Sequence, residues 1–458
     1  MSLEFILSII MIVLGVLLAI VFGGFALISI RESEHRAARV SSYIALIGCI
    51  SFLIAATLPP TGLLIIAALI ATIVTAGIVI FFWPFGKVDL SRDIPNARYD
   101  EREIMFARAR LIPGTGEYEA YYISHPEQKL IDDRIRAKPG LLSPGSKYYD
   151  RNLFSAPYAS FDFTGALRDA VNGDVVGEPV SIDSEQFTPY IKNLGKYFGA
   201  LDVGITKLRP YHVYSHIGRG SGTYGAPIPV EHDYAIAFSV EMDYLMIGAN
   251  PTAPGVMESA RQYVEAAKVG IQLASVIRHL GFAARAHIDG NYRVIAPLVA
   301  RDAGLGEIGR MGLLMTPRKG PRVRLGVVTT NLPLMADPPT RDSAIIDFCS
   351  ICEKCALACP SKSIPYGGRH EIGGAMRWKI DAESCFHYWN VIGTDCGRCM
   401  TVCPYSHPDS ISHNVVRWGA RQSGGFRRLV MAMDDLFYGK IPSPRPTPSW
   451  IRAVADND

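Results

Sequence analysis

The hydrophobic pattern divides the chain into an apolar N-terminal part and a longer mixed part. Residues 5–30, 43–58 and 63–83 are almost uninterrupted apolar runs. The first and third runs are long enough to cross a bilayer, and the second reaches that length when residues 40–42 are included. A secretory signal would need a basic start and a small-residue cleavage site, and the first run has neither. The pattern therefore predicts three transmembrane helices.

Charged residues beside these runs predict how the helices cross the membrane. Residues 59–62, between the second and third runs, carry no charge. Basic residues lie between the first two runs and just after the third: Arg31, Arg36, Arg39, Lys87 and Arg92. Because positively charged loops stay in the cytoplasm, we expect the N-terminus outside and everything after about residue 85 inside. This predicts a multi-pass protein of the inner (cytoplasmic) membrane, embedded in the lipid bilayer, whose catalytic part faces the cytoplasm.

Helix and strand patterns alternate in the mixed part from about residue 183, whereas residues 86–200 show few clean periodicities. Residues 255–280 give the strongest helix signal, which Gly281 ends. The other predicted elements are helices at 186–198 and 296–303 and strands at 202–208, 234–241, 283–288 and 323–329. Such alternation predicts an α/β or α+β core.

Composition bounds the number of domains and the class of partner. A chain of 458 residues can hold two or three domains with cores of their own. Its net charge of +3 is close to balance, so no nucleic acid is expected as a partner. The predicted parts are a membrane anchor (1–90), the N-terminal region of a catalytic unit (91–200), an α/β core (201–340), a cysteine-rich domain (341–410) and a C-terminal extension (411–458).

Two cysteine runs near the C-terminal end each finish in Cys-Pro. They are Cys349-x2-Cys352-x2-Cys355-x3-Cys359-Pro360 and Cys385-x10-Cys396-x2-Cys399-x3-Cys403-Pro404. This spacing is typical of a ferredoxin-like domain with two [4Fe–4S] clusters. In such domains the fourth cysteine of a run serves the other cluster. One cluster would then be bound by Cys349, Cys352, Cys355 and Cys403, and the second by Cys359, Cys385, Cys396 and Cys399.

Zinc and disulfides are the alternatives for these cysteines. Zinc sites usually combine pairs of C-x2-C with histidine or further cysteine, which differs from the pattern seen here. Disulfides need an oxidising compartment and tolerate any spacing. The ninth cysteine, Cys49, lies in an apolar run and is expected to pack there.

A glycine-rich segment, residues 304–309, has the form G-x-G-x-x-G. A dinucleotide site needs a strand before this motif and a helix after it, and here a helix-like pattern precedes it. We therefore expect these glycines to form a turn, or to let the backbone approach something large and flat.

Further short motifs lie on both sides of this segment. They are residues 303–310 followed by 320–325, residues 385–389 well ahead of Cys396, and residues 100–102, 105–106, 121–122, 125–127 and 437–439. Together they resemble the corrinoid-dependent reductive dehalogenases, over roughly residues 95–450. The resemblance implies a nitroreductase-like core within an α+β fold and an enzyme that replaces carbon–halogen by carbon–hydrogen in a small organohalide.

The same resemblance implies cobalamin, reduced to Co(I) with electrons from the clusters. The Asp-x-His-x-x-Gly signature that supplies a histidine to cobalt elsewhere is absent, which fits base-off binding without a protein ligand. The residues assigned to cofactor binding are Gly304, Gly306, Gly309 and Arg310. The electron donor must be a separate ferredoxin, flavodoxin or quinol-linked protein, and the oligomeric state is not predicted.

Removal of a halide with two electrons leaves a carbanion-like fragment that needs a proton. The family uses a tyrosine, with an arginine and an Asn or Lys nearby, and the order and spacing here select Tyr263, Arg324 and Asn291. A neighbouring cation could lower the tyrosine pKa from about 10. Small residues follow Tyr263 on one face of its helix and would leave room for a flat cofactor or permit close packing. Tyr244 is the alternative acid, and Arg310 the alternative arginine.

Two other functions stay open. Epoxyqueuosine reductase, a soluble enzyme, shares the corrinoid core and both clusters. It typically has Gly-Trp-x-Gly-Lys where this chain has residues 306–310, and Asp-Tyr-His where it has residues 262–264. A membrane-bound iron–sulfur electron carrier without a substrate of its own is the second alternative.

Overall fold

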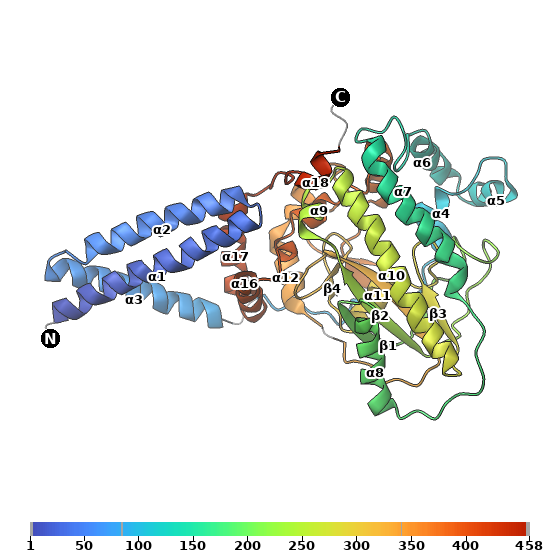
Figure 1. Cartoon of the computed structure of the whole chain (residues 1–458), viewed down its shortest axis with the longest axis horizontal. Helices are drawn as coiled ribbons and strands as arrows, with labels where there is room; N and C mark the ends of the chain where they lie inside the picture. Colours follow the sequence, from blue (N-terminus) through green and yellow to red (C-terminus); the bar gives the residue numbers. More distant parts are fainter. Residues whose placement is uncertain (1–2, 84–85, 340, 455–458) are drawn as a thin grey trace. The chain divides into compact units, whose positions relative to one another are not determined.

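The chain folds into two compact units, which are described separately (Figure 1). The computed structural model describes residues 3–83, 86–339 and 341–454. The helical unit combines Met1–Val88 with Pro408–Ser443, and the sheet unit combines Asp89–His407 with Pro444–Asp458. The predicted extension at 411–458 contributes to both units, and its last four positions, 455–458, lie outside the described residues. The five-part division of the sequence stays a prediction.

Three long apolar helices form most of the helical unit. They are α1 (Leu3–Arg31), α2 (His35–Ala55) and α3 (Pro60–Phe82). Each is long and apolar enough to cross a membrane. Pro60 is the first residue of α3. Proline is tolerated there because the backbone N–H that it lacks would have no hydrogen-bond partner within the helix. Most of the large apolar side chains of these helices are exposed. The three predicted apolar helices are confirmed, and the second begins earlier than expected, at His35.

Two further helices complete the helical unit: α16 (Ile411–Gln422) and α17 (Gly424–Tyr438). Ser423 separates them, and its hydroxyl accepts a hydrogen bond from the backbone N–H of Phe426 at 3.1 Å, which caps α17. α17 packs against α2 and α3. The sequence predicted only an extension here, without elements.

A four-stranded sheet forms the centre of the sheet unit. Its strands are β1 (Asp202–Lys207), β2 (Tyr234–Glu241), β3 (Ala284–His287) and β6 (Val323–Thr330), in the order β1-β2-β6-β3. All neighbouring pairs are antiparallel, and the predicted α+β class is confirmed. Gly326 lies opposite Phe238, where an added Cβ would come within 2.3 Å of the aromatic ring. Glycine is therefore required at the middle of β6.

Helices cover both faces of this sheet (Figure 1). They are α8 (Ser184–Tyr197), α10 (Ala253–His279) and α11 (Ala296–Asp302). Alternate residues of β2 point to opposite layers, so Phe238 packs with α8 and α10, and Ala237 packs with α11. The small residues below Tyr263, Ala267 and Gly270, belong to this packed core. They allow α10 to approach the sheet closely, which is the second of the two explanations considered for them.

The remaining elements surround the sheet. Ahead of it come α4 (Met105–Arg108), α5 (Gly116–Ser124), α6 (Pro126–Arg136) and α7 (Arg151–Ala166). The cysteine runs involve α12 (Ser343–Cys352), α13 (Lys354–Leu357), α14 (Ala382–Ile392) and α15 (Arg398–Thr401). Two hairpins pair β4 (Glu307–Ile308) with β5 (Leu314–Met315) and β7 (His370–Ile372) with β8 (Ala375–Arg377). Shorter elements are α9 (Tyr244–Gly248), α18 (Ser449–Arg452) and the 3-10 helices at Glu101–Glu103, Leu167–Val171, Pro210–His212 and Pro404–Ser406.

Candidate functional site

The predicted acid and the predicted arginine lie against each other. Tyr263 is on α10, and Arg324 is on β6 at the centre of the sheet. The packing of α10 on the sheet brings the Arg324 guanidinium carbon to 4.5 Å from the centroid of the Tyr263 ring. A cation over an aromatic ring is attracted by the negative face of the ring. Residues far apart in the sequence thus form one pair, called here the Tyr263–Arg324 pair.

Two residues that the sequence did not predict hold Arg324 in place. Its Nη2 donates to Asp395 Oδ2 at 3.0 Å and to the hydroxyl of Ser259. Ser259 in turn donates to the same carboxylate oxygen of Asp395. Asp395 directly precedes Cys396, so the arginine is tied to the loop that carries a predicted cluster ligand. This position beside Cys396 is the sequence signal that could have identified Asp395.

Burial dominates the protonation of this group. Burial raises the pKa of Tyr263 above its usual value, although the charge of Arg324 acts to lower it. Burial alone would lower the pKa of Arg324, but Tyr263 and Asp395 reverse the effect and the net pKa is raised. Burial also raises the pKa of Asp395 against the opposing effect of Arg324. The tyrosine pKa thus shifts upward rather than downward, because desolvation outweighs the neighbouring cation. Tyr263 is protonated at neutral pH.

The predicted third member, Asn291, makes its hydrogen bonds elsewhere. Its side chain is fully buried, and its Oδ1 accepts a hydrogen bond from Arg285 Nη2 at 2.7 Å. Its Nδ2 donates to a backbone carbonyl at 3.0 Å. The next residue, Tyr292, interacts electrostatically with the Tyr263–Arg324 pair instead. Burial is the main cause that raises the pKa of Tyr292 well above its usual value, and the neighbouring Tyr263 raises it further. The catalytic role of Asn291 stays a prediction, and Tyr292 joins the candidates.

The alternative acid, Tyr244, belongs to a different group of side chains. The guanidinium carbon of Arg445 lies 3.7 Å from the centroid of the Tyr244 ring, and Arg445 Nη2 donates a hydrogen bond to the Tyr244 hydroxyl. Arg322 lies 5.6 Å from the same centroid and forms an ion pair of 2.9 Å with Glu241 at the end of β2. Tyr244 therefore belongs to a charge network at the end of β2, and its replacement can serve as a control for replacement of Tyr263.

Electrostatic effects between the cysteines show which thiols lie near one another. Burial raises the pKa of Cys403 well above its usual value, and the thiols that raise it further are Cys349, Cys352 and Cys355. Burial and neighbouring thiols also raise the pKa of Cys385 to about 11 and that of Cys396 to about 12, and Cys359 acts on both. Thiols with raised pKa values lose their protons when a metal binds. The individual ligand assignment stays a prediction that these neighbours support.

Residues around the second run fit a bound group. Both polar atoms of the Asn250 side chain are buried, and neither has a hydrogen-bond partner among the described residues. This side chain lies against Gly397, between Cys396 and Cys399, where an added Cβ would be 1.9 Å from Asn250 Nδ2. All nine cysteines are free of disulfides. Among the described residues no set of three His, Cys, Asp or Glu is drawn together as for one ion, and a cluster places each thiolate on a separate iron.

The glycine-rich segment lies beside the first cysteine run. An added Cβ at Gly309 would be 3.3 Å from Cys349 Sγ. Arg310 donates through Nε to the carbonyl of Cys349 at 3.0 Å and forms an ion pair of 3.3 Å with Glu353. These residues therefore shape the loop that carries the predicted ligands. Corrinoid binding by Gly304, Gly306, Gly309 and Arg310 stays a prediction.

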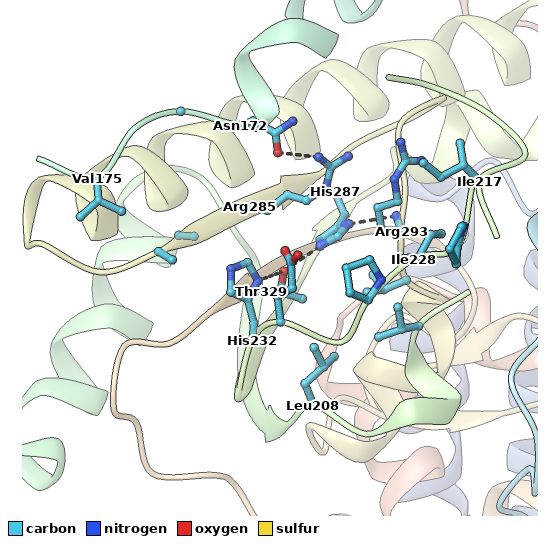
Figure 2. A pocket seen from close by; sticks show the side chains of 18 residues that line it. Asn172, Val175, Leu208, Ile217, Ile228, His232, Arg285, His287, Arg293 and Thr329 are labelled. Carbon is cyan, nitrogen blue, oxygen red and sulfur yellow. Dashed lines mark hydrogen bonds between the residues drawn. The ribbon is translucent and has the colours of Figure 1, made fainter. Parts of the chain in front are cut away.

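A pocket of about 320 Å³ with a mixed polar and apolar lining lies at another part of the sheet (Figure 2). Thr329 Oγ1 lies 2.8 Å from His232 Nδ1 and 3.0 Å from His287 Nε2. The backbone N–H of Arg293 donates to His287 Nδ1 at 3.0 Å, so the hydrogen of this imidazole is on Nε2. Burial lowers the pKa of both histidines. Thr329 is five residues from Arg324 on β6, which corresponds to about 17 Å along a strand, so this pocket is separate from the Tyr263–Arg324 pair.

Comparisons with known proteins identify a cluster domain and related enzymes. Residues 348–407 match the family model for a 4Fe-4S dicluster domain. The chain is 31% identical over 296 residues to a tetrachloroethene reductive dehalogenase of Sulfurospirillum multivorans, covering 57% of this chain and 58% of the relative. It superimposes on a solved catabolic reductive dehalogenase in complex with 3-bromo-4-hydroxybenzoic acid with a TM-score of 0.64 and 25% identity, covering 77% of this chain and 49% of that one.

A second solved structure concerns B12-dependent dehalogenation by a reductive dehalogenase. It gives a TM-score of 0.58 and 28% identity, covering 67% of this chain and 46% of that chain. An epoxyqueuosine reductase of Listeria monocytogenes is 32% identical, but only over 113 residues, 24% of this chain. The chain spans 58% of the Sulfurospirillum multivorans relative, 34% of the tetrachloroethene reductive dehalogenases of Desulfitobacterium hafniense and 49% of a solved catabolic reductive dehalogenase. The predicted resemblance is confirmed, as are the iron–sulfur domain and the preference for this family over the alternatives.

Proposed function

We propose that this chain, a homologue of the reductive dehalogenases, is itself a membrane-bound reductive dehalogenase that contains cobalamin and two [4Fe–4S] clusters. It would replace carbon–halogen by carbon–hydrogen in a halogenated aromatic compound or alkene. One observation carries the proposal: the Tyr263–Arg324 pair joins a protonated tyrosine to a cation that is tied to Asp395, the residue before Cys396. The proposed proton donor, Tyr263, would therefore lie near the cluster that delivers the electrons.

The residues around the pair fit a large partly polar group. Tyr263 and Tyr292 are only partly buried, and neither hydroxyl has a hydrogen-bond partner among the described residues. Arg324 Nε is buried and also lacks a partner in the described part of the chain. Tyr263, Tyr292 and Arg324 would hold the corrinoid and the substrate. Cobalamin, when bound, supplies the two-electron reductant that breaks the carbon–halogen bond.

Tyr263 would supply the proton. The reaction takes two electrons and one proton, breaks the carbon–halogen bond, forms a carbon–hydrogen bond and releases halide. Because burial holds the pKa of Tyr263 above its usual value, its phenol keeps the proton until the carbanion-like product needs it. The guanidinium of Arg324 would stabilise the resulting tyrosinate or the leaving halide, since an arginine stays charged in a buried site.

The membrane arrangement is also a proposal. Three apolar helices indicate membrane association. The positive charges of Arg31, Arg36 and Arg39, beside an uncharged segment at 59–62, favour three crossings of the inner membrane with the sheet unit in the cytoplasm. A separate ferredoxin, flavodoxin or quinol-linked protein would then deliver the electrons.

Metal content and halide release test the proposal together. Protein purified anaerobically with cobalamin supplied should contain about one cobalt and eight iron atoms per chain and release halide from halogenated phenols or ethenes. Eight iron atoms without cobalt would indicate an electron carrier. Full cobalt and iron with reduction of an epoxide-bearing nucleoside, but no halide release, would indicate the epoxyqueuosine type of reaction.

A further inference from the structure

The two C-terminal helices of the helical unit bury charged side chains and expose apolar ones. In α16, His413 and Arg417 are buried, whereas Trp418 is 61% exposed. In α17, Arg427 and Asp434 are buried. The exposed apolar side chains of the two helices are Ile411, Val415, Trp418, Leu429 and Leu436. A helix in water places these types of residue the other way round.

The exposed apolar residues form a stripe on each helix. In α16 they recur at intervals of four and three, at Ile411, Val415 and Trp418. In α17 the stripe consists of Leu429, Ala432, Met433 and Leu436, of which Met433 is partly buried. Residues at such intervals lie on one face of a helix. Each helix therefore has one continuous apolar face directed away from the unit.

The polar faces attach the two helices to one end of the apolar bundle. His413 Nε2 lies 3.1 Å from Glu32 Oε2, just after the end of α1. Arg36, in the first turn of α2, donates through Nε to the carbonyl of Leu436 at 3.3 Å. Arg427 donates to the carbonyl of Gly86, beyond the end of α3, at 3.0 Å. All three attachments are at the end where Arg31, Arg36 and Arg39 lie.

Aromatic contacts place this pair of helices at a defined depth. Phe437 lies 6.2 Å from Phe22 and 5.4 Å from Phe25 between ring centroids. Phe22 is the twentieth residue of α1, which begins at Leu3. Because about 20 helical residues span the roughly 30 Å hydrocarbon core, Phe22 would lie where α1 leaves the core. The ring centroids of Trp418 and Phe81, a residue in the last turn of α3, are 6.4 Å apart.

We propose that α16 and α17 form an amphipathic hairpin that lies in the membrane–water interface, with both apolar stripes in contact with lipid acyl chains. The proposal rests on the proposed membrane anchoring of α1–α3. Lipid is the occupant because the stripes continue the exposed apolar surface of those helices at the level where they emerge. Exposed Lys440 suits anionic headgroups, and a tryptophan such as Trp418 is typical of this depth.

Quenching by brominated lipid tests the position of Trp418. The complete cofactor-loaded chain is placed in nanodiscs of ordinary lipid or of lipid brominated near the headgroup end of the acyl chains. The bromine-dependent quenching of tryptophan emission is compared in the unchanged protein, in Trp418→Phe and in Trp83→Phe. Trp83 follows α3 directly and is 61% exposed, so it reports the anchor itself. Quenching by the cofactors is equal in both lipids and cancels from the ratio.

The two variants separate the hairpin from the anchor. We expect each to remove a similar share of the bromine-dependent quenching. If Trp83→Phe removes it and Trp418→Phe does not, the stripes are covered by protein, such as a second copy, and the hairpin proposal is wrong while the anchor stands. If neither tryptophan is quenched, the membrane anchoring and the hairpin proposal both fail. Iron and cobalt contents, measured in parallel, verify that each variant is folded.

Discussion

The helical unit and the sheet unit bury opposite kinds of residue. In the sheet unit, Ile236 and Phe238 are fully buried in the core, as in a protein surrounded by water. In the helical unit, large apolar side chains such as Leu17 are exposed, while Arg417 and Arg427 are buried. The same physical rule operates in both, since each unit buries the side chains that its surroundings would solvate poorly: apolar side chains in water and charged side chains in lipid. The difference fits the proposed membrane anchoring, in which lipid would surround the helical unit and water the sheet unit.

Removal of one cluster ligand should have the largest effect, and it should be confined to the sheet unit. We expect Cys403→Ala to lose one cluster, so that iron falls from about eight to about four atoms per chain, and to abolish halide release. Cys49→Ala, in the helical unit, should change neither. Colorimetric iron analysis and electron paramagnetic resonance of the reduced protein measure the result. Unchanged iron in Cys403→Ala would show that Cys403 is not a cluster ligand.

Removal of the proposed proton donor should have the next largest effect. We expect Tyr263→Phe to lower the rate of halide release by about 10²- to 10⁴-fold, the usual contribution of a general acid, with cobalt and iron contents unchanged. Tyr244→Phe is the matched control, because its hydroxyl bonds to Arg445 in another charge network. Equal rates for the two variants would show that Tyr263 is not the acid.

The contrast between the units also explains how much of the fold the sequence could predict. The strands at 202–208, 234–241, 283–288 and 323–329 and the long helix at 255–280 were predictable because each repeats a local period. The order β1-β2-β6-β3 was not, since the pairing of β6 with β2 depends on contacts between residues far apart in the sequence. The helices α16 and α17 were missed although apolar residues recur at helical spacing in both, and the sequence alone does not show that these apolar faces stay exposed.

The site divides in a similar way. The cysteines were predictable because three of four ligands to a cluster come from one tight loop with fixed spacing. Tyr263 and Arg324 came from resemblance, and the packing of α10 on β6 brings them together. Asp395 and Ser259 carry no motif of their own, because they act by holding Arg324 and any acceptor in the right place would serve. Apart from the position of Asp395 beside Cys396, such supporting residues become visible only in three dimensions.

Replacement of one exposed apolar residue by lysine in each unit should test the difference between their surroundings directly. Leu17 lies near the middle of α1 and is 51% exposed, and Ile123 in α5 of the sheet unit is 80% exposed. We expect Leu17→Lys to disfavour membrane insertion by about 2.5–3.5 kcal/mol and Ile123→Lys to change stability by no more than about 0.5 kcal/mol. The fraction of chain that resists alkaline extraction from membranes measures the first. Full retention of Leu17→Lys would mean that α1 faces water or protein.

The smallest effect is expected from pH, and it belongs to the sheet unit. The acid must be protonated to act, so the rate falls only as pH rises through its pKa. Burial raises the pKa of Tyr263 above the usual value of about 10, and its protonation should therefore leave halide release unchanged throughout the neutral range. Above pH of about 10 the unfolded chain would ionise this tyrosine before the folded one, so folding stability should also begin to fall there. A rate profile of the complete cofactor-loaded protein measures the first effect. A decline through neutral pH that Tyr263→Phe removes would mean that Arg324, rather than burial, controls the proton.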